Sequence, residues 1–224
     1  MSDDLSRFLV ARRAFFAKLG VGVAAFGAAA GASAPVGAQT AGAFRPASHT
    51  PDDWLDQLPG RHRLVLDATT PGAADTARLY ADNFFVANKS GYGLEPRDLA
   101  VVIVLRHHAT AFAYNDAMWA KYGAAMSQEL TFTDPKTKQA PTTNVYNSSG
   151  VTLASLIERG VHLAVCGLAT RYFAGVLARG GRGSTDDIFK ELSANLLGNA
   201  HLVSAGIVVV NRAQERGYTF AYVG

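Results

Sequence analysis

The sequence has a single cysteine, Cys166, in 224 residues. A lone cysteine cannot close a disulfide within its own chain, so a fold held together by internal disulfides is excluded. The thiol is therefore free, paired between chains, bound to a metal or chemically modified. Charged residues make up only 17% of the chain and apolar residues 49%, a composition that supports a large core and argues against extensive disorder.

Phosphate-binding loops and basic runs are also absent from the sequence. No GxxxxGK followed by Ser or Thr occurs, and no GxGxxG follows the first predicted strand. The formal net charge is +3, but residues 1–38 hold four basic and two acidic residues, which leaves 17 basic and 16 acidic residues for the rest. Because no basic run is interleaved with aromatic side chains, the sequence predicts no nucleic-acid partner.

Residues 1–38 have the features of an export signal. The stretch "ARRAFFAKLGVGVAAFGAAAGASAPVGAQT" begins with Arg12 and Arg13, continues with Gly and Ala, and contains a small-residue cleavage pattern ending at Ala38. The arginine pair predicts a twin-arginine (Tat) signal peptide, recognition by the Tat export machinery and a periplasmic destination. The alternative is an uncleaved anchor over 19–38, which its Gly and Ala content and Pro35 disfavour. After cleavage we expect no stable membrane span.

The rest of the chain alternates predicted strands with predicted helices. Residues 39–60 are expected to form a linker with one helical turn in "PDDWLDQL", and the domain is expected to occupy 61–224. Apolar, β-branched runs predict strands in "HRLVLDATT", "LAVVIVLR" and "VHLAVC". Alternation of this kind predicts the α/β class, as a three-layer flavodoxin- or Rossmann-like domain with a mostly parallel sheet built from right-handed crossovers.

Turn and capping residues set the expected ends of the helices. A helix after the second strand is expected to end at Gly123, and a polar insertion to occupy 124–148. Another helix should run from Leu168 to about Arg179, and Ser184 should cap the next one. In the tail, "GIVVVNRAQERG" fits a short helix before a final strand "YTFAYV", although "GIVVVN" alone would also fit a strand.

Chemically versatile side chains follow the predicted strands. They are Asp67, Thr69 and Thr70 after the first strand, Arg106, His107 and His108 after the second, Cys166 and Gly167 after the third, and Ser204 in the tail. In a parallel sheet the carboxyl ends of the strands lie at one edge, where α/β proteins bind their ligands. The sequence therefore predicts a site at this edge.

Cys166 has a functional and a structural interpretation. At the start of a helix, main-chain N–H groups and a nearby cation, Arg106 or a protonated His107 or His108, would favour its thiolate. We expect at most one of the two histidines to face the same crevice. The structural interpretation is that Cys166 packs in the core as a small apolar side chain.

Other chemistries have less support in the sequence. A Cys–His acyl-transfer site needs an orienting Asn or Asp, and Asn115 and Asp116 lie too far along the helix. The spacing of the two histidines and the cysteine matches no metal-binding motif, so no metal ligands are assigned, and no cofactor is identified. The remaining histidines, His62, His162 and His201, are expected to be scattered structural or solvated residues.

The domain resembles the DsrE/DsrF-like family over roughly residues 62–224. The resemblance lies in "VVIVLRHHATAFAYND", "LASLIERGVHLAVCGLAT" and "LVSAGIVVVNRAQERGYTFAYV". It implies a flavodoxin-like or Rossmann-like three-layer domain that assembles as homo-oligomers, trimers or hexamers. Some members of this family relay sulfur as a cysteine persulfide, and Cys166 falls where the sulfur-carrying cysteine would be expected.

The sequence thus predicts an exported protein that binds or transfers sulfur through Cys166. Arg106 and His107 are the expected catalytic partners of the thiol, and the expected ligand-binding residues are Asp67, Thr69, His108 and Gly167. The alternative is a non-catalytic periplasmic protein that binds a small ligand, metal or cofactor, or an oligomeric protein in which Cys166 only packs.

Overall fold

The computed structural model describes residues 45–224, and this part of the chain contains a five-stranded sheet. The strands are β1 His62–Ala68, β2 Leu99–Leu105, β3 His162–Cys166, β4 Ala200–Val203 and β5 Thr219–Tyr222. Their order is β4-β3-β2-β1-β5, and every neighbouring pair is parallel. The predicted α/β class with a parallel sheet is confirmed.

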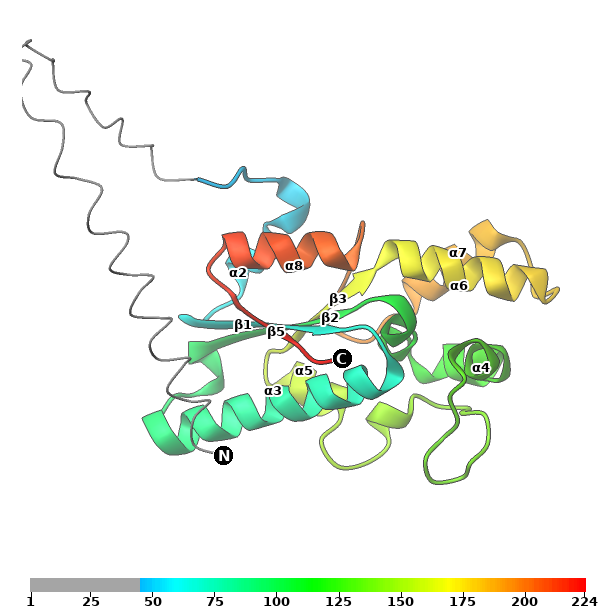
Figure 1. Cartoon of the computed structure of the whole chain (residues 1–224), viewed down its shortest axis with the longest axis horizontal. Helices are drawn as coiled ribbons and strands as arrows, with labels where there is room; N and C mark the ends of the chain where they lie inside the picture. The colour runs from blue at the N-terminus through cyan, green and yellow to red at the C-terminus, as the bar shows by residue number, and fades with distance from the viewer. Residues whose placement is uncertain (1–44) are drawn as a thin grey trace, which may run out of the picture. The chain divides into compact units, whose positions relative to one another are not determined.

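Helices cover both faces of the sheet (Figure 1). The α-helices are α2 Trp54–Gln57, α3 Pro71–Tyr92, α4 Asp116–Leu130, α5 Leu153–Glu158, α6 Gly167–Arg179, α7 Thr185–Ala194 and α8 Gly206–Glu215. Short 3₁₀ helices are η1 Thr50–Asp52, η2 Pro96–Asp98, η3 His107–Ala113 and η4 Val145–Asn147.

The central strand β2 divides the core into two layers. All seven of its residues are buried, as its unbroken apolar sequence predicts for a strand covered on both faces. Val101, Ile103 and Leu105 pack with α3, α4, α5, α6 and α7, whereas Val102 and Val104 pack with α2 and α8 on the opposite face. The described part of the chain therefore forms three layers, with the sheet in the middle.

The direction of the chain explains which helices lie on which face. The chain steps from β1 through β2 and β3 to β4, and then returns across the sheet to β5 beside β1. Because crossovers between parallel strands are right-handed, a reversal of direction moves the connecting helix to the other face. Accordingly α3 and α6 pack in one layer and α8 in the other.

Most of the expected helices are present. Helix α6 ends at Arg179, and the Ser184 hydroxyl accepts a hydrogen bond from the Asp187 main-chain N–H at 3.1 Å to cap α7. The tail forms α8 followed by β5, as expected for "GIVVVNRAQERG" and "YTFAYV". Strand β4 was not predicted, because it has four residues, none of them buried.

The prediction that a helix ends at Gly123 is wrong. Residues 107–113 form a 3₁₀ helix, Asn115 then caps α4, and α4 continues through Gly123 to Leu130. Gly123 serves a close contact instead of a turn, since a Cβ there would overlap the Pro141 carbonyl oxygen and lie 3.2 Å from its carbon. The predicted insertion over 124–148 is correspondingly shorter, because its first seven residues are helical.

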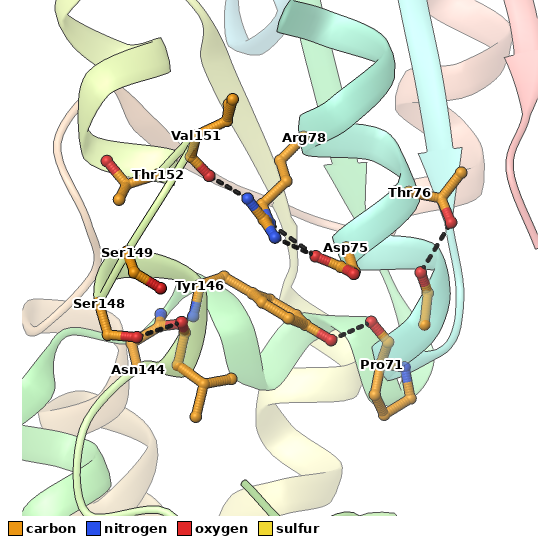
Figure 2. Close-up of polar contacts among 12 residues, drawn as sticks. Pro71, Asp75, Thr76, Arg78, Asn144, Tyr146, Ser148, Ser149, Val151 and Thr152 are labelled. Carbon is orange, nitrogen blue, oxygen red and sulfur yellow. Dashed lines mark hydrogen bonds and ion pairs between the residues drawn. The ribbon is translucent and has the colours of Figure 1, made fainter. Parts of the chain in front are cut away.

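The segment that follows α4 folds back onto the domain (Figure 2). The buried Asn144 amide donates to the carbonyl oxygens of Phe112 at 2.8 Å and Tyr114 at 3.0 Å. The Tyr146 hydroxyl donates to the Pro71 oxygen at 2.7 Å. Arg78 pairs with Asp75 and donates to the Val151 oxygen. These contacts tie a polar segment, expected to be an insertion, to α3 and η3.

The expected start of the domain at Arg61 is also too late in the chain. Helix α2 supplies the predicted helical turn, but Leu55 is fully buried and Leu58 is 4% exposed, both in the layer with α8. The Tyr218 hydroxyl donates to the Leu55 oxygen at 2.7 Å. Residues expected to be linker thus belong to the core.

The predicted signal peptide over 1–38 lies outside the described residues. Within residues 45–224, none of the helices combines the length and apolar character that crossing a membrane requires.

Replacing Gly123 with alanine tests the anchoring of the segment after α4. Because the new methyl group overlaps main-chain atoms of Pro141, we expect Gly123→Ala to lower the free energy of unfolding by about 1–3 kcal/mol. Urea denaturation measures this change. The matched control is Gly91→Ala in α3, where a Cβ meets nothing within 4 Å and no destabilisation is expected. Equal stability of the two variants would contradict the close contact.

Candidate functional site

The carboxyl ends of the strands surround a cavity of about 620 Å³. It is lined by Thr69 and Thr70 after β1, by Arg106, His107 and His108 after β2, by Cys166, Leu168, Ala169 and Tyr172 at the end of β3 and in α6, and by Ala205, Gly206 and Ile207 after β4. Its size falls within the roughly 300–1,000 Å³ typical of small-molecule sites. The ends of β1, β2 and β3, which the sequence predicts to lie together, all contribute to this lining.

Cys166 ends β3 and is the N-cap residue of α6. It is 7% exposed and lines the cavity, so it is neither sealed in the core nor freely accessible. Its main-chain oxygen accepts a hydrogen bond from the Thr170 hydroxyl at 3.1 Å, and that hydroxyl accepts one from Tyr114 at 3.2 Å. Burial raises the pKa of Tyr114, so this phenol is a neutral donor at ordinary pH. The chain of hydrogen bonds holds the main chain at the cysteine.

Arg106 is oriented by Asp67. Its Nε and Nη2 atoms donate to the two carboxylate oxygens at 2.7 and 2.8 Å, in the bidentate geometry that arginine forms with carboxylates. These hydrogen bonds raise the pKa of Arg106, with smaller contributions from the charges of Tyr222 and Cys166. Asp67 is 2% exposed and does not line the cavity, so it acts on the site through Arg106 rather than as the expected ligand-binding residue.

Both His107 and His108 line the cavity, so the expectation that at most one would do so is wrong. The reason lies in the backbone, which turns at His107 with a positive φ of 50° and enters the 3₁₀ helix η3. The expectation assumed a regular element in which neighbouring side chains diverge. His107 is exposed, while His108 is partly buried with its ring 6.5 Å from that of Phe173.

Two glycines bring the helices close to the strand ends. A Cβ on Gly167 would lie 2.7 Å from the Val203 oxygen, and one on Gly206 would lie 2.7 Å from the Arg106 Cβ. Gly167 is the first residue of α6 and Gly206 of α8. Gly167 was expected to bind ligand, but it does not line the cavity and instead lets α6 pack against the end of β4.

Thr69 lines the cavity as expected and connects it to the end of the chain. Its hydroxyl donates to the Gly224 oxygen at 2.7 Å and lies 3.3 Å from the Tyr222 hydroxyl. Tyr222 ends β5, so its place follows from the pairing of Asp67 with Tyr222 in the parallel register of β1 and β5. Ser204, expected at this edge, is exposed and does not line the cavity.

The apolar wall of the cavity was missed by sequence reasoning. Leu168 is 68% exposed, Tyr172 51% and Ile207 57%, although all three are large and apolar or aromatic. Leu168 and Ile207 are the second residues of α6 and α8, close to the strand ends, and Tyr172 lies one turn further along α6. That position was the available signal, because ligand-binding residues gather where α/β strands end.

Other candidates have structural roles. Asn115 caps α4 by accepting from the Met118 N–H at 3.3 Å, and Asp116 accepts from the Asn144 N–H at 2.8 Å. The segment 131–152 contributes no residue to the cavity. Among residues 45–224, no group of three or more His, Cys, Asp and Glu side chains is arranged to hold a metal ion.

His162 and His201 are not scattered, contrary to the expectation. On the neighbouring strands β3 and β4, His162 Nδ1 lies 2.8 Å from His201 Nε2, and Trp54 stacks on His201 with ring centroids 3.9 Å apart. Burial lowers the pKa of both histidines, and the charge of His162 lowers that of His201 further. The pair was missed because β4 was not predicted, so nothing placed His201 beside β3.

No protein-family model and no curated protein matches the sequence. Among solved structures, a protein of unknown function from Methanobacterium thermoautotrophicum is similar at 15% identity, with a TM-score of 0.35, over 72% of this chain and 99% of that one.

The histidine pair makes stability depend on pH. Since folding lowers both histidine pKa values, the unfolded chain binds more protons once the pH falls below the ordinary histidine value of about 6.5. We expect the free energy of unfolding to fall as the pH is lowered from about 7 to about 5, and to level off once both histidines are protonated in the folded protein. Urea denaturation across this range measures the slope.

The double variant His162→Asn/His201→Asn should flatten that slope, while His49→Gln, an exposed position, serves as the control. An unchanged slope in the double variant would assign the pH dependence to other groups.

Proposed function

We propose that this protein carries sulfane sulfur as a persulfide on Cys166, in the manner of the DsrE/DsrF-like family that its sequence resembles. One observation carries the proposal: the single cysteine lines a small-molecule-sized cavity that it shares with Arg106 and two histidines. A structural cysteine needs no such cavity, and reactive thiols are typical of partly accessible, electropositive surroundings.

The chemistry needs only the groups at this edge of the sheet. A cavity histidine, His107 or His108, takes the proton of the Cys166 thiol, and the thiolate attacks the outer sulfur of a donor R–S–SH. A new S–S bond forms at Cys166 while the donor S–S bond breaks, and the donor leaves as the thiolate R–S⁻. No oxidant is required, because the sulfane sulfur changes carrier without a net redox change. Arg106 stabilises the anionic sulfur in both states.

Asp67 has a positioning role in this scheme. Its two hydrogen bonds hold the guanidinium at the end of β2, and Gly206 leaves room for the Arg106 side chain against α8. A flexible arginine would lose side-chain entropy on binding an anion, and an arginine held in advance avoids that loss.

Sulfur loading can be measured directly, because the chain has one thiol. We expect incubation with inorganic polysulfide to add one sulfur atom to the intact protein, and dithiothreitol to remove it. Cys166→Ser should gain no sulfur, and Arg106→Gln should load about tenfold more slowly, since it loses a charged hydrogen-bond partner of the anionic sulfur. Intact-mass spectrometry over time gives both rates.

Arg106→Lys is the matched control, because it keeps the charge and loses the bidentate geometry. If the wild-type protein gains no sulfur, or if Cys166→Ser gains as much sulfur as the wild type, sulfur transfer through Cys166 is wrong. The cavity would then remain only as a binding site.

We also propose that residues 1–38 direct export by the twin-arginine pathway and that the domain acts in the periplasm as a homo-oligomer, a trimer or hexamer. The support is the Arg12-Arg13 pair, the Gly- and Ala-rich stretch after it, and the family resemblance.

Replacing both arginines tests export. We expect Arg12→Lys/Arg13→Lys to leave the uncleaved precursor in the cytoplasm, because the twin-arginine signal is read by a receptor. Cell fractionation and immunoblotting measure the distribution, with Arg7→Lys as the control. Full processing of the double variant would refute this route.

A further inference from the structure

The cavity is polar on one side and apolar on the other, and the strand order explains the division. Thr69, Thr70 and Arg106 follow β1 and β2, whereas Leu168, Tyr172 and Ile207 follow β3 and β4. Because the sheet order is β4-β3-β2-β1-β5, these two sets lie at adjacent halves of the same edge. Cys166 ends β3, at the boundary between the halves.

The polar half is suited to an anion. No acidic residue lines the cavity. Asp67 is buried and binds Arg106 without itself lining the cavity. Asp67 occupies Nε and Nη2 of Arg106, and within the described part of the chain Nη1 makes no hydrogen bond. The guanidinium therefore keeps donors for a ligand after its own orientation has been satisfied.

The apolar half is suited to a hydrocarbon group. Leu168, Tyr172 and Ile207 are each more than half exposed, around a cavity whose lining also includes Ala169 and Ala205. An inorganic anion would leave these side chains in water. A ligand with an apolar body would remove their surface from water at roughly 25 cal/mol per Å².

We propose that the ligand of this cavity is a small organic anion with an apolar body, and that it is an organic thiosulfonate, R–SO₂–S⁻, which delivers sulfur to Cys166. The identification of the donor rests on the function proposed above. The anionic end lies toward Arg106 and the group R toward Leu168, Tyr172 and Ile207.

The transfer step is balanced without a further reactant. The Cys166 thiolate attacks the terminal sulfur of R–SO₂–S⁻, and the bond between that sulfur and the sulfonyl sulfur breaks. The sulfinate R–SO₂⁻ leaves, and Cys166 holds the persulfide anion. The proton of the thiol goes to a cavity histidine, as in the proposed function.

Binding can be separated from transfer by using a ligand that has no sulfur to give. In isothermal titration calorimetry, full-length Cys166→Ser should bind benzenesulfonate at least about tenfold more tightly than methanesulfonate. Methanesulfonate has the same sulfonate group and almost no apolar body. Arg106→Gln in the same background should weaken benzenesulfonate binding about tenfold.

Helix α8 offers a matched pair of variants for the apolar wall. Ile207→Asp places a carboxylate at the cavity, whereas Val208→Asp makes the same change at the next position, which is 39% exposed and does not line the cavity. We expect Ile207→Asp to weaken benzenesulfonate binding about tenfold or more and Val208→Asp to leave it unchanged. Equal binding of the two sulfonates, or equal effects of the two aspartates, would overturn the ligand class.

The loading of wild-type protein distinguishes this inference from the proposed function. Faster loading from benzenethiosulfonate than from inorganic thiosulfate supports both. If polysulfide loads Cys166 but benzenesulfonate does not bind, the ligand class is wrong and sulfur carriage stands. If benzenesulfonate binds through Arg106 and Ile207 but no donor loads Cys166, sulfur carriage and the thiosulfonate donor are wrong and the organic-anion site stands.

Discussion

The return of the chain across the sheet is the constraint on which the site depends. Helix α6 follows β3 on one face, and α8 follows the neighbouring β4 on the other, so the two helices diverge from adjacent strand ends. An opening is left between them, as at the switch points of other open parallel sheets. Gly167 and Gly206 allow both helices to start in contact with the sheet, so the opening stays small enough to surround a ligand.

The Asp67–Arg106 pair determines the charge within that opening. A buried ion pair is weak support for stability, because removing two charges from water costs several kcal/mol that their attraction must offset. Its geometry has a clearer consequence for the site. Two hydrogen bonds from a carboxylate that is 2% exposed fix the guanidinium at the end of β2, with its remaining donors available to the cavity. A positive group held in this way lines the same cavity as the chain's one thiol, and it keeps a more constant position there than a free surface arginine would.

Sequence patterns within single segments predicted much of the fold. Most of the wrong predictions concern contacts between segments that lie far apart in the sequence. The seven apolar residues of β2 identified a central strand, and the Ser184 cap identified α7, because both signals are local. Strand β4 has four partly exposed residues, and its pairing with β3 is a long-range contact. Likewise, glycine is typical of a helix end, but Gly123 lies within a helix. A glycine is needed there because a Cβ would overlap the carbonyl oxygen of Pro141. The strand ends predicted where the cavity lies, whereas the backbone turn at His107 brings both histidines into its lining.

The position of Cys166 between the polar and apolar halves follows from the same sheet order. A sulfur anion is stable only where charge or hydrogen-bond donors replace water, and Arg106 supplies both from the end of β2. An apolar body gains free energy only where side chains such as Leu168 and Ile207 are left uncovered, after β3 and β4. Under the proposed function, the end of β3 is therefore where the sulfur of Cys166 would meet an anion held on one side and a hydrocarbon group held on the other. A thiol at the end of β1 or β4 would meet only one of these two environments.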